Sequence, residues 1–218
     1  MRSAKPRKSK RPIGRPSDPA RLVGRDALLA ATCELLKTMP PKEISFVKIA
    51  RLCGANPSLV SYYFGDRLGL LTAVAEKLTT EYDPGLAAQA AGDSSEEQFR
   101  ARVGRVLELE AMNPFFHRLM LEELNLSDEK LVQDLLRRLN KRGLEAYHNI
   151  FARGIARGEL AEVDAELLFV MNVAISQTFD NTHRNYESVV GHKVDRDEFL
   201  NRYEKFVGDI LLYGVVAR

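Results

Sequence analysis

A short run of polar and hydroxyl-bearing side chains between residues 56 and 64 has the spacing of one helix. Asn56 is a typical helix cap, and Pro57 suits the first helical turn, where its missing N–H has no partner to lose. The positions left to face outward are Ser58, Leu59, Ser61 and Tyr62. Hydroxyls can reach phosphates or base edges, and a leucine can contact a thymine methyl. The pattern therefore predicts a helix that recognises duplex DNA through hydrogen bonds and apolar contacts.

A second short helix, predicted over residues 46–53, must hold the reading helix in place. Ser45 can accept the free N–H groups at its start. Its apolar residues recur at three- and four-residue spacing, at Phe46, Ile49, Ala50 and Cys53. Gly54 supplies the turn, and an inward stripe continues at Val60, Tyr63 and Phe64. Two short helices around a tight turn form a helix-turn-helix, whose second helix can enter a major groove.

Two further features flank this motif. An amphipathic helix comes before it, with Leu28, Ala31, Leu35 and Leu36 on one face. The sequence Tyr-Phe-Gly-Asp-Arg, residues 63–67, comes after it and opens a long apolar helix with Leu68, Leu71, Val74, Ala75 and Leu78. Together these features, over roughly residues 23–82, resemble the DNA-binding domain of the TetR family of transcriptional regulators. The resemblance implies a repressor that a small-molecule ligand releases from its operator.

The predicted DNA contacts extend to both ends of the motif. Ser45, Lys48 and Arg67 are candidate phosphate contacts, and Pro57 and Tyr63 complete the set as the first and a late residue of the reading helix. In the family, the position of Pro57 is often a lysine and that of Tyr62 often a histidine or tyrosine. Because this lysine is missing, one expected phosphate contact is lost and few donors remain for base readout.

The N-terminal residues carry a strong positive charge. Residues 1–25 hold nine Lys or Arg and one Asp, whereas the rest of the chain holds 23 basic and 29 acidic residues. The segment Arg11-Pro12-Ile13-Gly14-Arg15-Pro16 resembles a minor-groove AT-hook, so Arg11 and Arg15 are predicted to contact DNA. We expect residues 1–22 to be a basic flexible arm that orders on its polyanionic partner. A generic solubilising or translation-start tail is the alternative.

The remaining chain predicts an all-α fold of about nine helices. Helix starts are signalled by Ser94 with Glu97, by Asn113-Pro114, by Ser127, by Asp164 and by Asp195 with Glu198. With 218 residues, of which 45% are hydrophobic, the chain can bury one sizeable core and a small appended domain. We therefore divide it into the arm 1–22, a helix-turn-helix domain 23–82 and a C-terminal ligand-binding and dimerisation domain 83–218.

A homodimer interface is predicted from two C-terminal helices. The last helix carries apolar residues at steps of four and three, and the helix after Asp164 is apolar around most of its circumference. A two-fold dimer also doubles the groove contacts of a small reading head. The predicted interface residues are Leu168, Met171, Ile175, Phe199, Tyr203, Phe206, Ile210 and Tyr213. TetR-like proteins generally pair through their last two helices, whereas an intrachain bundle is the alternative.

The family resemblance also implies an unknown small-molecule effector bound in the C-terminal domain. Bulky apolar residues and a few polar ones could supply its pocket. The predicted ligand-binding residues are Phe116, His117, Met120, Tyr147, Phe151, Asn172 and Gln177. Each of them could instead belong to the ordinary core.

Enzymatic readings find no support in the sequence. It lacks the metalloprotease, nucleophile-elbow, Walker and dinucleotide-binding motifs, and no two of its four histidines have the spacing of a helical metal pair. We expect no cofactor, no metal, no membrane span and a soluble cytoplasmic protein. Two alternatives stay open: a DNA-binding activator, and a helical ligand-binding or protein-interaction module that does not read DNA specifically.

Overall fold

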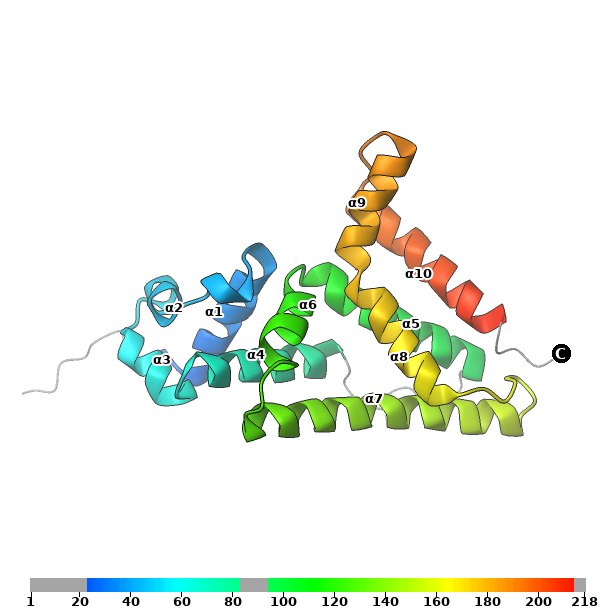
Figure 1. Cartoon of the computed structure of the whole chain (residues 1–218), viewed down its shortest axis with the longest axis horizontal. Coiled ribbons are helices and arrows are strands. Elements are labelled where there is room, and N and C mark those ends of the chain that lie inside the picture. Colours follow the sequence, from blue (N-terminus) through cyan, green and yellow to red (C-terminus); the bar gives the residue numbers. More distant parts are fainter. Residues whose placement is uncertain (1–22, 83–93, 214–218) are drawn as a thin grey trace, which may run out of the picture.

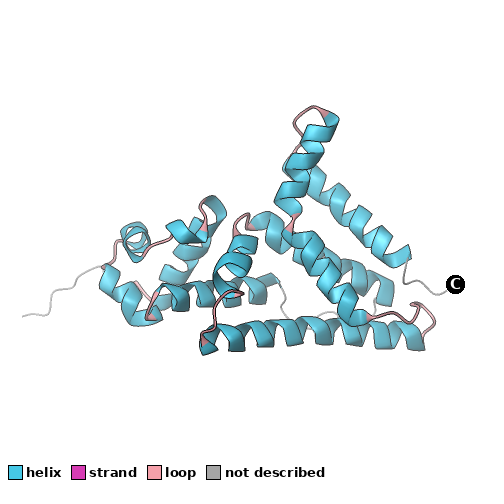
Figure 2. Ribbon diagram, in the orientation of Figure 1, coloured by secondary structure: helices cyan, strands magenta, loops and turns pink. Residues whose placement is uncertain are grey.

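The computed structural model describes residues 23–82 and 94–213 and contains ten α-helices, one 3-10 turn and one π-helical turn, with no strand in these ranges. Figure 2 shows that helices joined by short loops make up nearly all of this part of the chain. The helices are α1 Arg25–Thr38, α2 Phe46–Cys53, α3 Pro57–Phe64, α4 Arg67–Tyr82, α5 Ser95–Met112, α6 Phe116–Arg118, α7 Lys130–Ala156, α8 Ala165–Gln177, α9 Phe179–Val190 and α10 Arg196–Tyr213. The two turns are η2, 3-10, at Pro41–Glu43, and η4, π-helical, at Leu119–Leu124. The predicted all-α fold is confirmed.

The helix-turn-helix forms at one end of the molecule, as the sequence predicts (Figure 1). The Ser45 hydroxyl accepts a hydrogen bond from the Lys48 N–H at 3.3 Å, which caps α2. Gly54 ends α2 in the left-handed region, with φ 61°, a conformation that favours glycine. The Asn56 side chain then caps α3 by accepting the Ser58 N–H at 3.0 Å. Local capping and one glycine therefore set the angle at which α3 leaves α2.

One apolar cluster holds the DNA-binding helices together and continues beyond them. It includes Leu28, Ile49, Val60 and Leu70, all with exposures of 0%. The same cluster extends to residues of the C-terminal region, namely Leu109, Phe116, Leu119, Leu124, Val132 and Leu135. The predicted domain boundary at residue 82 therefore does not coincide with a boundary of the apolar core, because α4, α6, η4 and α7 pack into the same cluster.

The second apolar cluster belongs to α5, α7, α9 and α10 and to the turn that leads into α8. Helix α5 is central, since it contacts α4, α7, α8, α9 and α10. It begins with the predicted capping box, in which the Ser94 hydroxyl accepts the Glu97 N–H at 3.2 Å and the Glu97 carboxylate accepts the Ser94 N–H at 3.0 Å. Asp164 and Asp195 likewise accept N–H groups at the starts of α8 and α10. The sequence signals for these three starts are confirmed.

Helix α9 was not predicted, and it changes how the last helices are arranged. A single residue, Thr178, separates α8 from α9, and its hydroxyl donates back to the Ile175 carbonyl at 2.9 Å. Because neither glycine nor proline marks this break, the sequence offers no strong turn signal. Helix α9 and the start of α10 form a hairpin that protrudes from the rest of the molecule (Figure 1).

A DNA-reading face and a charged internal cavity

Helix α3 presents its predicted outward residues at the surface, with one exception. Tyr62 is 80% exposed, and Ser58 and Ser61 are exposed as well. Both serine hydroxyls have local partners, because that of Ser58 lies 2.9 Å from the Asn56 amide oxygen and that of Ser61 donates to the Gly65 carbonyl at 3.0 Å. Leu59 is half-buried against the core. Tyr62 is therefore the largest group on α3 that is available for contact.

The aromatic residues at the end of α3 support one another. Tyr63 was expected to face inward, yet it is 37% exposed and meets Tyr62 edge-on, with ring centroids 5.2 Å apart. Phe64 lies 6.5 Å beyond Tyr63, and the Arg25 guanidinium lies 5.1 Å above its ring. The Tyr62 ring is thus supported on one side by the Tyr63 ring, because edge-to-face pairs are favourable.

The phosphate contacts predicted outside α3 have different surroundings. Ser45 and Lys48 are exposed beside the reading helix. Arg67 is partly exposed and already paired: it donates to both carboxylate oxygens of Glu123, at 2.9 and 2.6 Å, and to the Pro41 carbonyl at 2.8 Å. Its guanidinium would have to leave this ion pair to meet a phosphate, so we no longer propose it as a DNA contact. Arg11 and Arg15 lie outside the described residues.

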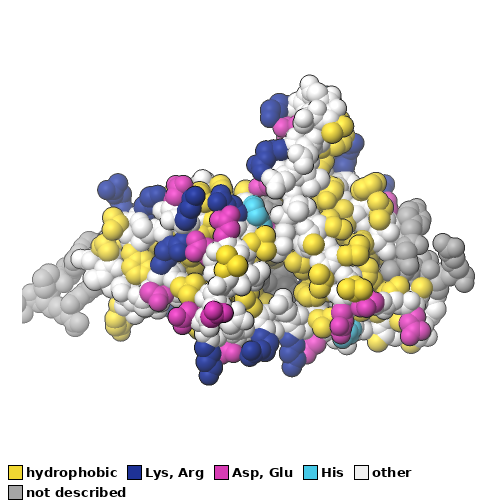
Figure 3. Space-filling view, in the orientation of Figure 1, with side chains coloured by type: hydrophobic (Ala, Val, Ile, Leu, Met, Phe, Trp, Pro, Cys, Tyr) yellow, Lys and Arg dark blue, Asp and Glu magenta, His cyan; other side chains and the backbone are white. Residues whose placement is uncertain are grey.

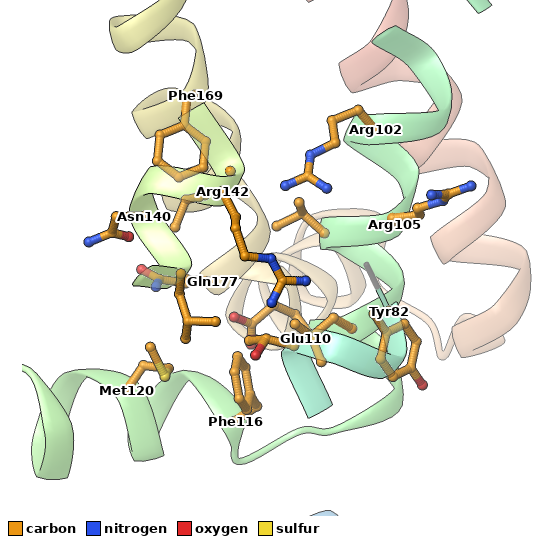
Figure 4. Close-up of a pocket in the computed structure, with 16 residues that line it drawn as sticks. Tyr82, Arg102, Arg105, Glu110, Phe116, Met120, Asn140, Arg142, Phe169 and Gln177 are labelled. Atoms are coloured by element: carbon orange, nitrogen blue, oxygen red, sulfur yellow. The ribbon is translucent and has the colours of Figure 1, made fainter. Parts of the chain in front are cut away.

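A cavity of about 130 Å³ lies in the C-terminal region, between α4, α5, α6, α7 and α8 (Figure 4). Its apolar walls include Val106, Phe116, Met120, Phe169 and Val173. Four charged residues also line it: Arg102, Arg105, Glu110 and Arg142. A mostly apolar pocket with a few polar groups is the usual form of a small-molecule site.

Three of the seven predicted ligand residues line this cavity, namely Phe116, Met120 and Gln177. The lining does not include His117, Tyr147, Phe151 or Asn172. Tyr147 and Phe151 instead pack around Phe99 in the second apolar cluster, with ring centroids 5.8 and 5.5 Å from it. Burial raises the pKa of Tyr147 to about 12, as expected of a closed core. These four residues are therefore no longer proposed as ligand contacts.

The charged lining residues were missed in the sequence, although a signal for them exists. Arg102 and Glu110 are 5% and 6% exposed, and they follow Phe99 and Leu107 by three residues. Both charges therefore fall on the inward stripe of α5, where an apolar residue would be expected. Burial, assisted by the nearby charge of Asp180, raises the pKa of the Glu110 carboxyl to about 8. Charged residues at inward positions of an amphipathic helix could thus have indicated the charged lining of the cavity from the sequence.

A groove of about 700 Å³ adjoins the cavity along α7 and α8. The two spaces share four lining residues, which are Asn140, Phe169, Val173 and Gln177. Arg137 and Lys141 on α7 lie at the groove, whereas Leu121 and Val170 provide apolar wall. The cavity therefore continues outward along the surface of α8.

Exposed apolar side chains lie on α8 and on the second half of α10, and we call them together the apolar surface. Figure 3 shows hydrophobic side chains gathered over α8. The exposed large residues there are Leu167, Val170 and Met171 on α8, and Phe206 and Ile210 on α10. Of the predicted interface residues, Met171, Phe206 and Ile210 belong to this surface. Leu167 and Val170 were not predicted.

The remaining predicted interface residues have other positions. Phe199 is only 5% exposed, and its ring stacks on Tyr203, with centroids 5.5 Å apart, and lies near Tyr186 of α9. Leu168 and Ile175 are half-buried against the same core. The predicted stripe on α10 is split because α9 covers its first half and leaves the second half open. Phe199 is therefore a core residue, and the Tyr213 side chain lies outside the described residues.

Residues 23–82 and 94–213 contain neither a candidate metal site nor a candidate membrane span. No group of three metal-ligating side chains occurs there, and no helix in these ranges is long and apolar enough to cross a membrane. Cys33 is buried in the DNA-binding core, where burial raises the pKa of its thiol to about 11. Such a thiol is a packing group, because reactivity requires the thiolate.

Comparisons with known proteins find a matching family and two curated regulators with partial similarity. The family described as "Tetracyclin repressor-like, C-terminal domain" matches residues 96–211. The HTH-type transcriptional regulator BetI of Stenotrophomonas maltophilia is 31% identical over 83 residues, which is 37% of this chain and 42% of BetI. BetI 2 of Chromohalobacter salexigens is 31% identical over 88 residues, or 39% of this chain and 41% of that protein. The matched stretch thus spans only about two fifths of each curated relative.

Solved structures share the fold over most of the chain. The regulator FadR from Bacillus subtilis, in complex with stearoyl-CoA, has a TM-score of 0.66 at 18% identity, covering 87% of this chain and 98% of FadR. The ketosteroid regulator KstR2 of Mycobacterium tuberculosis has a TM-score of 0.64 at 12% identity, covering 89% of this chain and 95% of KstR2. With the helix-turn-helix in place and the C-terminal family matched, the chain belongs to the TetR family of transcriptional regulators.

Proposed function

We propose that this protein is a cytoplasmic, dimeric repressor that binds a DNA operator and is released by a small molecule in the α5–α8 cavity. One observation carries the proposal: the apolar core beneath the reading helix is continuous with residues that line the cavity. Phe116 belongs to both, and Met120 lines the cavity while packing on that core. Binding in the cavity can therefore be linked to the position of α3.

DNA reading is assigned to α3 and the residues beside it. Tyr62 is 80% exposed, and Pro57, Ser58, Ser61 and Tyr63 are exposed around it. Ser45 and Lys48, at the start of α2, are placed to contact the backbone next to the groove that α3 enters. Since α3 itself carries no Lys or Arg, we assign a large share of the affinity to the arm, including Arg11 and Arg15.

A second copy of the chain is proposed to cover the apolar surface of α8 and α10. Large exposed apolar patches on soluble proteins mark interaction sites. Beside Phe206, a groove of about 600 Å³ between α9 and α10 is lined by aromatic side chains that include Tyr186 and Tyr203. A two-fold pairing of this surface would bury it and present two copies of α3 to successive major grooves, roughly 34 Å apart.

The link between cavity and reading head is assigned to η4. Glu123 lies in this π-helical turn, three residues after the cavity residue Met120, and its carboxylate holds Arg67 at the start of α4. Arg67 follows α3 by only three residues. A shift of η4 caused by a ligand would therefore pull or release the end of the recognition helix through one charge-assisted pair.

The proposal is tested with Tyr62→Ala. Genomic fragments enriched by the wild-type protein are titrated with each variant by fluorescence anisotropy, and the oligomeric state is measured in parallel. We expect at least about 10-fold weaker binding, since one hot-spot aromatic is worth roughly 2 kcal/mol, with an unchanged oligomeric state. Val189→Ala, at an 84% exposed site in α9, is the matched control. Equal DNA affinity of Tyr62→Ala and wild type would exclude α3 as the reading helix.

A further inference from the structure

The cavity between α5 and α8 contains a buried carboxyl with an unpartnered oxygen, and this group indicates the chemical class of the effector. We propose that the ligand is a compact, uncharged molecule, about the size of one substituted benzene ring, whose hydroxyl or carbonyl oxygen makes a hydrogen bond with Glu110. This inference rests on the proposed function, because it names the molecule that occupies the regulatory site.

Glu110 is the polar anchor of this site. It is 6% exposed, it lines the cavity, and its Oε2 has no hydrogen-bond partner among the described residues. Figure 4 shows its carboxyl turned toward the central space that Phe116 and Met120 also border. A buried polar atom without a partner is costly. A ligand that supplies the missing hydrogen bond therefore gains affinity.

The arginines of the cavity do not call for an anionic ligand. Arg102 and Arg142 already interact with other groups of the protein, so their charges are not free for a ligand. Arg105 has a buried N–H group without a partner in the described part of the chain, but its guanidinium extends away from the central space in Figure 4. The remaining polar group that faces this space with an unused oxygen is the carboxyl of Glu110.

The protonation state of Glu110 favours an uncharged partner. Burial, assisted by the nearby charge of Asp180, raises the pKa of the Glu110 carboxyl to about 8, so the carboxyl keeps its proton at neutral pH. A protonated carboxyl both donates and accepts hydrogen bonds. It can therefore pair with a neutral hydroxyl or carbonyl group, and no net charge has to be buried.

The size of the cavity favours a compact molecule. Its volume of about 130 Å³ is below the roughly 300–1,000 Å³ of typical ligand pockets and close to the roughly 150 Å³ of an apolar cavity that binds benzene. Phe116, Phe169 and Val173 provide apolar wall for a ring. The groove along α8 offers little further room in the dimer, because Val170 in its wall belongs to the apolar surface that the second copy is proposed to cover.

The test compares four probes that share a benzene ring bearing one carbon atom and differ only in what this carbon carries. Binding of benzyl alcohol, benzoate, benzylamine and toluene to the full chain is measured by calorimetry at pH 7, without DNA and at protein concentrations that keep the chain dimeric. We expect benzyl alcohol to bind at least about 10-fold more tightly than benzoate or benzylamine, because burial of a charge is costly. Equal or tighter binding of either charged probe, or no binding of benzyl alcohol, would overturn the proposal.

A longer probe tests the size of the ligand under the same conditions. We expect 4-butylbenzyl alcohol to bind more weakly than benzyl alcohol, because the cavity has no room for the added chain. Equal or tighter binding would show that the ligand extends along the groove and would contradict a compact effector, since each buried methylene group adds affinity.

Two variants and a matched control locate the hydrogen bond. Glu110→Leu should lower the affinity for benzyl alcohol relative to toluene by about 5-fold, the worth of one net hydrogen bond. Glu110→Gln keeps a donor and an acceptor and should retain the wild-type ratio. Glu108→Leu removes an exposed carboxylate of the same helix that does not line the cavity, and it should leave the ratio unchanged. An unchanged ratio in Glu110→Leu would contradict the assigned hydrogen bond, and the ranking of probes on the wild-type chain tests the proposal even where a variant is unstable.

The outcome also separates this inference from the proposed function. Operator affinity is then measured with and without saturating benzyl alcohol. If benzyl alcohol binds through Glu110 but leaves operator affinity unchanged, the ligand class stands and the regulatory role of the cavity fails. If the operator is bound but no uncharged probe enters the cavity, the DNA-binding function stands and the ligand class is wrong.

Discussion

Replacing Phe206 with aspartate should separate the proposed dimer. Phe206 is 60% exposed on α10, next to the aromatic groove. A phenylalanine side chain offers about 200 Å², so about 120 Å² would be buried per copy, worth about 3 kcal/mol at 25 cal/mol per Å². A two-fold interface contains the residue twice, which gives about 6 kcal/mol as an upper bound.

The expected loss is smaller than this bound because buried area does not convert fully into affinity. We expect Phe206→Asp to weaken dimerisation by about 2–4 kcal/mol, which is roughly a 30- to 1,000-fold increase in Kd. Sedimentation velocity over a dilution series measures this change directly. Leu131→Asp is the matched control, because Leu131 is 59% exposed at the start of α7 and lies outside the apolar surface.

Two results would contradict the proposed interface. A dimer of unchanged Kd in Phe206→Asp would show that α10 does not form the interface. An equal loss in Leu131→Asp would show that any new surface charge has the same effect. Thermal unfolding of both variants should stay cooperative, since neither side chain belongs to the buried core.

Three further predictions concern the arm, the link to the reading head and the cavity. Deleting residues 1–16 should weaken operator binding and reduce the slope of log K against log salt by about 0.9 for each lost phosphate contact; an unchanged slope would exclude a working arm. Glu123→Gln should lower the free energy of unfolding by about 1 kcal/mol, because the Arg67 pair loses its charge while remaining partly exposed, and should reduce the effect of ligand on operator affinity; urea titrations and binding that match wild type would show that the pair is incidental. Burial raises the pKa of Glu110 from 4.5 to about 8, so the folded state keeps a proton that the unfolded chain loses, and stability should fall as pH rises between these values. Glu110→Gln should flatten that fall in urea titrations between pH 5 and pH 8, and an unaltered pH dependence would contradict the raised pKa of Glu110.

Much of the fold follows from local signals in the sequence. The caps at Ser45, Asn56 and Ser94 and the turn at Gly54 all act within four residues, and each is observed. Such short-range chemistry is readable without knowledge of the tertiary structure. Helix α9 was missed because its boundary at Thr178 depends on packing rather than on a breaker residue.

The candidate sites could be predicted only in part, since burial is a tertiary property. Exposure of Tyr62 follows from its place on a capped surface helix, and the structure agrees. By contrast, whether Phe199 or Phe206 faces a partner depends on where α9 ends, which the spacing of apolar residues cannot show. In the sequence, Arg67 closely follows the reading helix and is therefore a candidate phosphate contact. Its ion-pair partner Glu123 is 56 residues further along the chain, so only the folded structure reveals the pair.

Operator reading by a dimer can be tested by selecting genomic fragments with the purified protein near physiological salt and footprinting the fragments that are enriched. We expect a protected palindrome with two half-sites separated by about one helical turn, roughly 34 Å, or a multiple of it. No enrichment, or protection spread evenly over A·T-rich DNA, would contradict a dimeric regulator that reads a specific operator through α3.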